Sequence, residues 1–253
     1  MQKRYTVTGE RKKYYYENLQ SDYAHLLKTR KENEVSTLFL SEFHYEEDMR
    51  KSLSSETTRI GKVLEKRVDE YYKDYFTESL GNDYPGANIT LGTYEVMDDG
   101  RKKKNRKKED PDKIHYSVSF KLDNYVSYIG KDSNMLSVEL GRLITPQTDI
   151  SERTDRTRQY PVDLDETRSF QTTITITLPA GYKALNIEDF NKKVDNEAGS
   201  FISTCTADGS KLTLTVKKSY KQLHMDASKW PLMLQFLDAA SLLQTGKLFL
   251  VKG

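Results

Sequence analysis

The chain has 253 residues, enough to bury a sizeable core in one large or two small domains. Its 40 basic and 38 acidic residues leave a net charge of +2, so no global field attracts nucleic acid or anionic lipid. The single cysteine, Cys205, excludes an internal disulfide and any multi-cysteine zinc site.

The N-terminal residues 1–8 include basic side chains but lack the apolar core of a signal peptide. No stretch approaches the 18 apolar residues that a membrane span needs, so none is predicted. Further along, Tyr14, Tyr15 and Tyr16 form a run of phenol rings, each with an apolar face and a polar hydroxyl. We interpret these three tyrosines as a possible glycan- or peptide-binding surface.

Residues 54–80 carry apolar side chains at the spacing of a helix that packs one face on a core. Ser54 or Ser55 is a suitable N-cap, and Gly81 a suitable end. The apolar stripe consists of Ile60, Val63, Leu64, Val68, Tyr71, Tyr72, Tyr75 and Phe76. We therefore expect tyrosines 71, 72 and 75 to pack in the core or at its boundary.

Four segments alternate apolar and polar residues as half-buried antiparallel strands do: 89–96, 114–122, 174–178 and 212–216. Asp208 and Gly209 separate the last strand from residues 201–205, which predicts a hairpin. A second turn at 196–199 extends this hairpin to a meander. Residues 231–243 predict a short helix with Pro231 in its first turn.

These elements predict an antiparallel β-sandwich with one long and one short helix. Two polar connectors interrupt the pattern, at residues 98–113 and 145–158. We favour a single β-rich domain over residues 1–253. The alternative is a division into residues 1–150, with strands and the long helix, and residues 151–253, with the meander, the short helix and a final strand.

The first connector contains seven basic residues within 101–108, a composition that could neutralise phosphates of nucleic acid. The run lacks interleaved aromatic residues for base stacking, and acidic residues follow it at Glu109 and Asp110. A solvated hairpin tip is the favoured interpretation, and nucleic-acid binding is the less favoured one.

Three other features bear on catalysis. Asp163, Asp165 and Thr167 match the Asp-x-Asp-x-Thr pattern of phosphotransferases that form an aspartyl-phosphate, but Pro161 argues against the buried parallel strand that this chemistry requires. Cys205 lies in a strand-like context, so a buried small residue is favoured over a nucleophile with His224 as its base. The four histidines show no metal-binding spacing, and no cofactor is predicted.

From about Leu122 onward, the order of elements resembles the C-terminal portion of bacterial transglutaminase-like proteins, a domain of unknown function that flanks a cysteine-peptidase-like core. The matching segments are 136–140, Arg158 with Pro161 and Val162, 174–182, 196–199 with Phe201, the strand that ends at Val216, 230–236 and 248–252.

The resemblance implies a parent protein of the bacterial periplasm or cell envelope. In such proteins the catalytic Cys, His and Asp lie upstream of this region, and no residue here matches them. The chain would then be a non-catalytic accessory domain, with the transglutaminase-like core as its partner. The alternative is a stand-alone glycan- or peptide-binding module.

Overall fold

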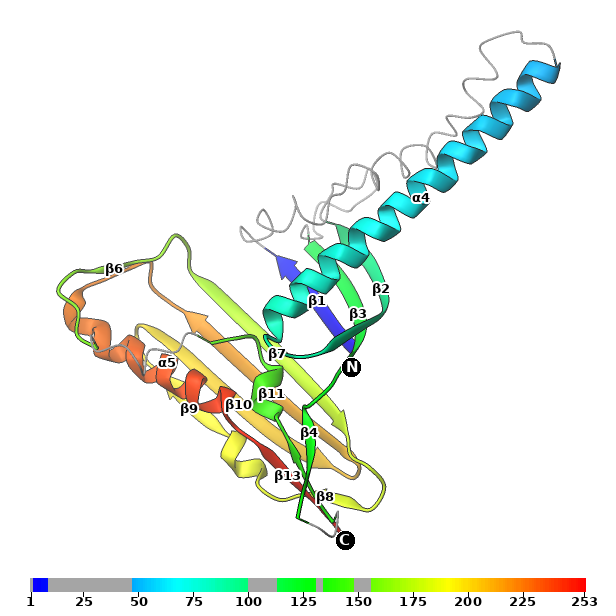
Figure 1. The fold of residues 1–253 in the computed structure, drawn as a ribbon. Helices are drawn as coiled ribbons and strands as arrows, with labels where there is room; N and C mark the ends of the chain where they lie inside the picture. Colours follow the sequence, from blue (N-terminus) through cyan, green and yellow to red (C-terminus); the bar gives the residue numbers. More distant parts are fainter. Residues whose placement is uncertain (1, 9–46, 100–112, 131–133, 148–155) are drawn as a thin grey trace. The chain divides into compact units, whose positions relative to one another are not determined.

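A computed structural model of the chain describes residues 2–8, 47–99, 113–130, 134–147 and 156–253 (Figure 1). Tyr14 to Tyr16 and the basic run 101–108 lie outside these residues. The chain divides into two compact units, residues 1–82 with 86–122, and residues 83–85 with 123–253. The connector predicted at 145–158 lies inside the second unit.

The first unit contains a long helix and a three-stranded antiparallel sheet of order β1-β3-β2. Its elements are β1 (Gln2–Thr8), α4 (Glu47–Asp83), β2 (Ile89–Asp99) and β3 (Lys113–Leu122). The C-terminal half of α4 packs on the sheet through Phe76, whose ring centroid lies 5.3 Å from that of Tyr94 and 5.1 Å from that of Tyr116.

The long helix is confirmed, and it extends further than the prediction at both ends. Gly81 lies within α4 and does not end it, because the chain stays helical to Asp83 and turns only at Pro85 and Gly86, which has φ of +75°. Tyr72 is buried against Tyr71, Phe76 and Tyr94, as the core interpretation of these tyrosines predicts.

The second unit is built on a four-stranded antiparallel sheet of order β7-β11-β10-β9. Its strands are β7 (Arg168–Thr177), β9 (Lys192–Asp195), β10 (Gly199–Asp208) and β11 (Lys211–Tyr220). The predicted hairpin is confirmed, since Asp208 pairs with Lys211 around Gly209, whose φ is +55°. The predicted turn at 196–199 joins β9 to β10 and completes the meander.

A second four-stranded sheet has the order β4-β5-β13-β8, and β6 and β12 form a separate two-stranded ladder. The strands are β4 (Val126–Ile129), β5 (Met135–Val138), β6 (Val162–Asp163), β8 (Tyr182–Ala184), β12 (His224–Met225) and β13 (Leu248–Lys252). Short 3-10 turns are η2 (Leu140–Leu143), η3 (Ile187–Phe190) and η4 (Ala227–Lys229).

The short helix α5 (Trp230–Gln244) packs on β10 and β9, and Figure 1 shows it lying along one side of the meander. Pro231 falls in its first turn, as predicted. The fully buried core of this unit includes Phe190, Phe201, Leu212, Leu214, Phe236 and Leu243. The described residues therefore form a mainly antiparallel β structure with one long and one short helix, which confirms that part of the fold prediction.

Candidate binding site

Strands β7 and β11 place two cations and an aromatic ring on the buried side of the meander. Side chains alternate between the two faces of a strand, so Lys218 and Tyr220 share the face of the buried Leu212, Leu214 and Val216. Arg168 lies directly across from Tyr220 on the neighbouring strand. We call Arg168, Lys218 and Tyr220 the cation–aromatic cluster.

Both cations contact the same ring. The guanidinium carbon of Arg168 lies 4.9 Å from the ring centroid of Tyr220, and Nζ of Lys218 lies 5.3 Å from it. The ring centroids of Phe236 and Tyr220 lie 5.4 Å apart in a T-shaped arrangement, which connects the cluster to α5. A cation within about 6 Å of a ring centroid is attracted by the ring, by about 0.5–2 kcal/mol.

A chain of amide groups connects the cluster to the end of α5. Lys218 Nζ donates a hydrogen bond to Oε1 of Gln147 at 2.9 Å, and the backbone N–H of Gln147 donates to Oε1 of Gln244 at 3.0 Å. Lys218 is only 7% exposed, so its charge is held largely out of water. The side chain that accepts a hydrogen bond from this ammonium group is the neutral amide of Gln147.

Within the described part of the chain, no carboxylate pairs with the positive charges of the cluster. Among the described residues, neither Arg168 nor Lys218 forms a salt bridge, and Nε of Arg168 is buried with no hydrogen-bond partner. A buried charge is costly unless it is paired. Two donors of this kind beside an aromatic ring form a suitable receptor for a carboxylate or phosphate group.

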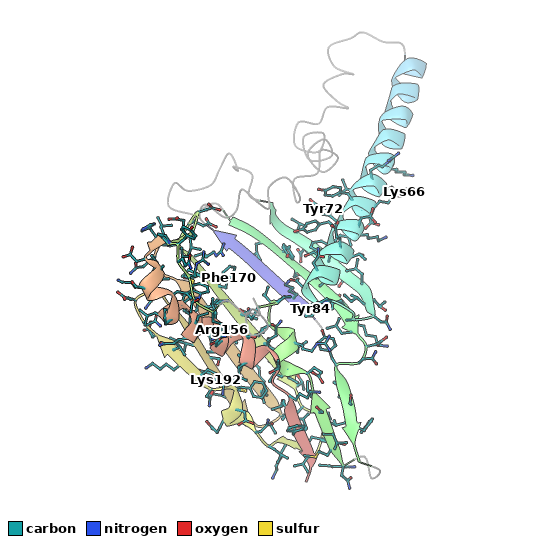
Figure 2. All side chains as sticks on the ribbon, turned by 60° about the vertical axis from the view of Figure 1, so that its left-hand side comes forward. Lys66, Tyr72, Tyr84, Arg156, Phe170 and Lys192 are labelled. Atoms are coloured by element: carbon teal, nitrogen blue, oxygen red, sulfur yellow. The ribbon has the colours of Figure 1, made fainter. Side chains whose placement is uncertain are left out.

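Two further arginines lie along α5. Arg156 forms a bidentate ion pair with Asp238 of α5, and its Nη1 donates to Oδ1 of Asp238 at 3.1 Å. Figure 2 shows Arg156 beside this helix. The guanidinium of Arg158 lies 4.9 Å from the ring centroid of Trp230. The backbone N–H of Gln147 and the side chains of Arg156 and Arg158 thus each contact a residue of α5.

The phosphotransferase interpretation of Asp163 and Asp165 is not supported by their positions. Both side chains are exposed, and Asp163 belongs to a two-residue strand in an antiparallel ladder, whereas the chemistry requires the end of a buried parallel strand. Oδ1 of Asp163 lies 2.6 Å from Nδ1 of His224. This hydrogen bond and the charge of Asp163 raise the pKa of His224 above its usual value.

Cys205 is buried on the inner face of β10, which confirms its interpretation as a core residue. Burial, with a smaller contribution from the charge of Glu188, raises the pKa of its thiol to about 11. His224 lies exposed in the separate β6–β12 ladder, whereas Cys205 is buried in β10, so the structure gives no support to a nucleophile and base pair of these two residues. The thiol of Cys205 is therefore protonated at neutral pH and poorly nucleophilic.

The described residues show no group of three or more His, Cys, Asp or Glu side chains that could hold a metal ion. No helix in this part of the chain is long and apolar enough to cross a membrane. The proposed surface at Tyr14, Tyr15 and Tyr16 lies outside the described residues and stays a prediction.

Sequence reasoning missed the cation–aromatic cluster, although one signal for it was present. The alternation of the strand at 212–216 continues to residues 218 and 220, which places a lysine on an inward position. Charged residues are almost never fully buried unless they are paired, so this lysine marks an unusual site. The contribution of Gln147, far away in the sequence, could not be foreseen.

Comparison with known proteins gives one match. Residues 136–250 match the sequence profile of a family described as a domain of unknown function, DUF3858. No curated protein and no solved structure matches the chain in the same comparisons. The matched segment lies inside the second unit and holds β7, β11 and α5, so this part of the chain, cation–aromatic cluster included, is similar to that family of domains.

Proposed function

We propose that the chain is a non-catalytic accessory domain of a transglutaminase-like protein of the bacterial periplasm or cell envelope. Its second unit would act as a β-sandwich that braces the catalytic core or forms one wall of its cleft. The observation that carries this proposal is the match of residues 136–250 to a family of domains of unknown function, in the region that resembles the C-terminal portion of transglutaminase-like proteins.

The state of Cys205 supports the proposal. A transglutaminase or cysteine peptidase needs an accessible thiolate beside a base. Cys205 is 4% exposed, and burial raises the pKa of its thiol. The catalytic thiolate would then come from the partner core.

The DNA upstream of the codon for Met1 gives the most direct test. We expect the reading frame, or a neighbouring gene, to encode a segment with a catalytic Cys, His and Asp. A stop codon and ribosome-binding site directly upstream, with no such gene nearby, would contradict the proposal.

An assay of the isolated chain gives an independent test. We expect no incorporation of a primary amine into glutaminyl peptides and no peptide hydrolysis, and the same result for Cys205→Ser. Turnover that disappears in Cys205→Ser would show that the chain itself is the enzyme and would refute the accessory role.

A second candidate function is a binding module for ligands that carry a carboxylate or phosphate group. The cation–aromatic cluster favours it, because Lys218 is buried with a neutral partner and Nε of Arg168 is buried with none. An oxyanion that binds there would supply the missing negative charge. Such a module could serve a transglutaminase-like parent or act alone.

Thermal unfolding at constant ionic strength, with inorganic phosphate or with succinate, tests this function. A ligand at ten times its Kd stabilises the folded state by about 1.4 kcal/mol. We expect Arg168→Met and Lys218→Met to lose this stabilisation, since both replacements keep the side-chain volume. Lys217→Met, on the exposed opposite face of β11, is the matched control and should keep it. Equal stabilisation in all three variants would indicate general charge screening and would contradict a site at the cluster.

A further inference from the structure

The outer edge of β7 is long, and no described strand pairs with it. β7 is the end strand of its sheet, spans ten residues, and within the described residues pairs only with β11. Residues 169–177 contain neither a charged residue nor a proline. Proteins usually protect such edges with charges, prolines, bulges or short strands. The opposite edge of the same sheet is protected in this way, since β9 has four residues and carries Lys192, Lys193 and Asp195.

The hydrogen-bond pattern shows which backbone groups point to this edge. The N–H of Leu178 donates to the carbonyl of Ser210 at 2.7 Å, in the register that continues the β7–β11 ladder. Hydrogen-bonded pairs alternate with non-bonded pairs along an antiparallel ladder, so the even-numbered residues of β7 bond to β11. The odd-numbered residues therefore direct their N–H and C=O groups outward: Ser169, Gln171, Thr173, Thr175 and Thr177.

We propose that this edge pairs with the same edge of a second copy of the chain. The two β7 strands would run antiparallel about a twofold axis at Thr173, and the two meanders would form one continuous sheet. In this register Thr173 faces its own copy, Gln171 faces Thr175, and Ser169 faces Thr177. All five outward residues then form hydrogen-bonded pairs.

Three properties of β7 favour a second copy over an unrelated strand. The paired stretch has no charge, so self-pairing brings no like charges together. A twofold axis perpendicular to the sheet places the same face of both copies on the same side. The hydroxyl-bearing residues 169, 173, 175 and 177 of the two copies therefore lie side by side on one face of the joined sheet. The half-buried Ile174 and Ile176 lie on the other face, which they share with Phe170, and gain apolar neighbours from the partner strand.

The pairing would stop at two copies. A twofold contact between identical edges is closed, because each copy uses the same edge of this sheet and none of it is left for a third copy. The other edge strand of the same sheet, β9, is short and rich in lysine, which disfavours further pairing through this sheet. A discrete dimer is therefore expected, and a fibre is not.

The oligomeric state of the full-length chain tests the proposal. Multi-angle light scattering after size exclusion should give twice the chain mass of 29.3 kDa. Thr173→Lys places two ammonium groups face to face on the axis and should give a folded monomer whose unfolding transition no longer depends on protein concentration. The matched control is Thr215→Lys, which makes the same change on the same face in the adjacent interior strand and should stay dimeric. A monomeric wild-type chain, or a dimeric Thr173→Lys variant, would overturn the proposal.

Disulfide trapping tests the register. In a Cys205→Ser background, Thr173→Cys should form an oxidised dimer, because residues in a hydrogen-bonded pair have Cα atoms about 5.5 Å apart. Thr175→Cys should not, because its two copies would be offset by four residues, or about 14 Å. Trapping at 175 without trapping at 173 would refute this register. A chain that captures extended peptides of other sequence but stays monomeric would refute self-pairing.

Discussion

Gly141 has no room for a side chain, and replacing it by alanine is the sharpest test of how η2 packs against α5. A Cβ built on this buried residue overlaps the carbonyl oxygen of Leu243 and lies 2.6 Å from that of Gln244, at the last turn of α5. Such contacts are essentially never shorter than 3.0 Å, so backbone must move on at least one side. The N–H of Gly141 also donates to the carbonyl of Gly246 at 2.9 Å, a bond that the movement would strain.

We expect Gly141→Ala to lower the free energy of unfolding of the second unit by about 3 kcal/mol. Overpacking costs about 1–3 kcal/mol, and the upper end applies because the neighbours are backbone atoms that no rotamer change can move away. A weakened hydrogen bond adds about 1 kcal/mol. The smaller conformational entropy of an unfolded alanine offsets about 0.4–1 kcal/mol.

Urea unfolding followed by fluorescence measures this change, because the only tryptophan, Trp230, lies in the same unit. With an m-value of about 2 kcal/mol/M, the midpoint should fall by about 1.5 M. Gly81→Ala is the matched control, since no atom lies within 4 Å of its Cβ and it belongs to the first unit. It should leave the tryptophan transition unchanged. A midpoint for Gly141→Ala within about 0.3 M of wild type would refute the close approach of η2 and α5.

Three further predictions concern single side chains. At pH 8 the thiol of Cys205 should react with a thiol-specific disulfide reagent far more slowly in the folded chain than in urea, because burial raises its pKa to about 11; equal rates would contradict this. In NMR titrations His224 should titrate above 6.5 and shift back in Asp163→Asn, since Asp163 stabilises the imidazolium. This stabilisation is fully present below the unfolded pKa of about 6.5 and is lost as pH rises through the folded pKa. Phe76→Ala should destabilise the first unit by about 3–5 kcal/mol, measured by circular dichroism of its helix, and a loss below about 1 kcal/mol would contradict the packing of α4 on the sheet.

The elements that could be predicted from the sequence are those with one face toward the core and the other face toward solvent. Strand 212–216 alternates because one face is buried and the other half-buried, and Gly209 marks a turn that needs positive φ. For β7 the sequence predicted only residues 174–178, whereas the strand begins at Arg168. An edge strand is exposed on more than one side, so the alternation at Ser169 to Gln171 disappears although the backbone stays extended.

The candidate site was harder to predict than the fold. The alternation along a strand predicts which residues lie on the same face of the sheet. It does not predict which residues of other elements pack against that face. Gln147 meets Lys218 only because η2 and α5 bring the segment after Ile144 across the meander. The active-site patterns that local spacing suggested, at Asp163 and at Cys205, both have ordinary structural explanations.

The cluster and the open edge both include residues of β7, which leads to a further prediction. In the proposed dimer, Arg168 of one copy faces Leu178 of the other, so the two copies of Arg168 lie ten residues apart, or about 34 Å. A dimer would thus present two cationic sites at a fixed spacing, and a polyanion that spans this distance would gain from the high effective concentration of its second contact.

Long-chain polyphosphate and inorganic phosphate separate the two contributions. Thr173→Lys should weaken binding of polyphosphate at least tenfold, because it separates the two copies of the cation–aromatic cluster. It should leave binding of inorganic phosphate unchanged, because the residues of each cluster stay the same. Arg168→Met should weaken both and stay dimeric. If polyphosphate binds Thr173→Lys as tightly as wild type, the two sites do not act together, whatever the oligomeric state.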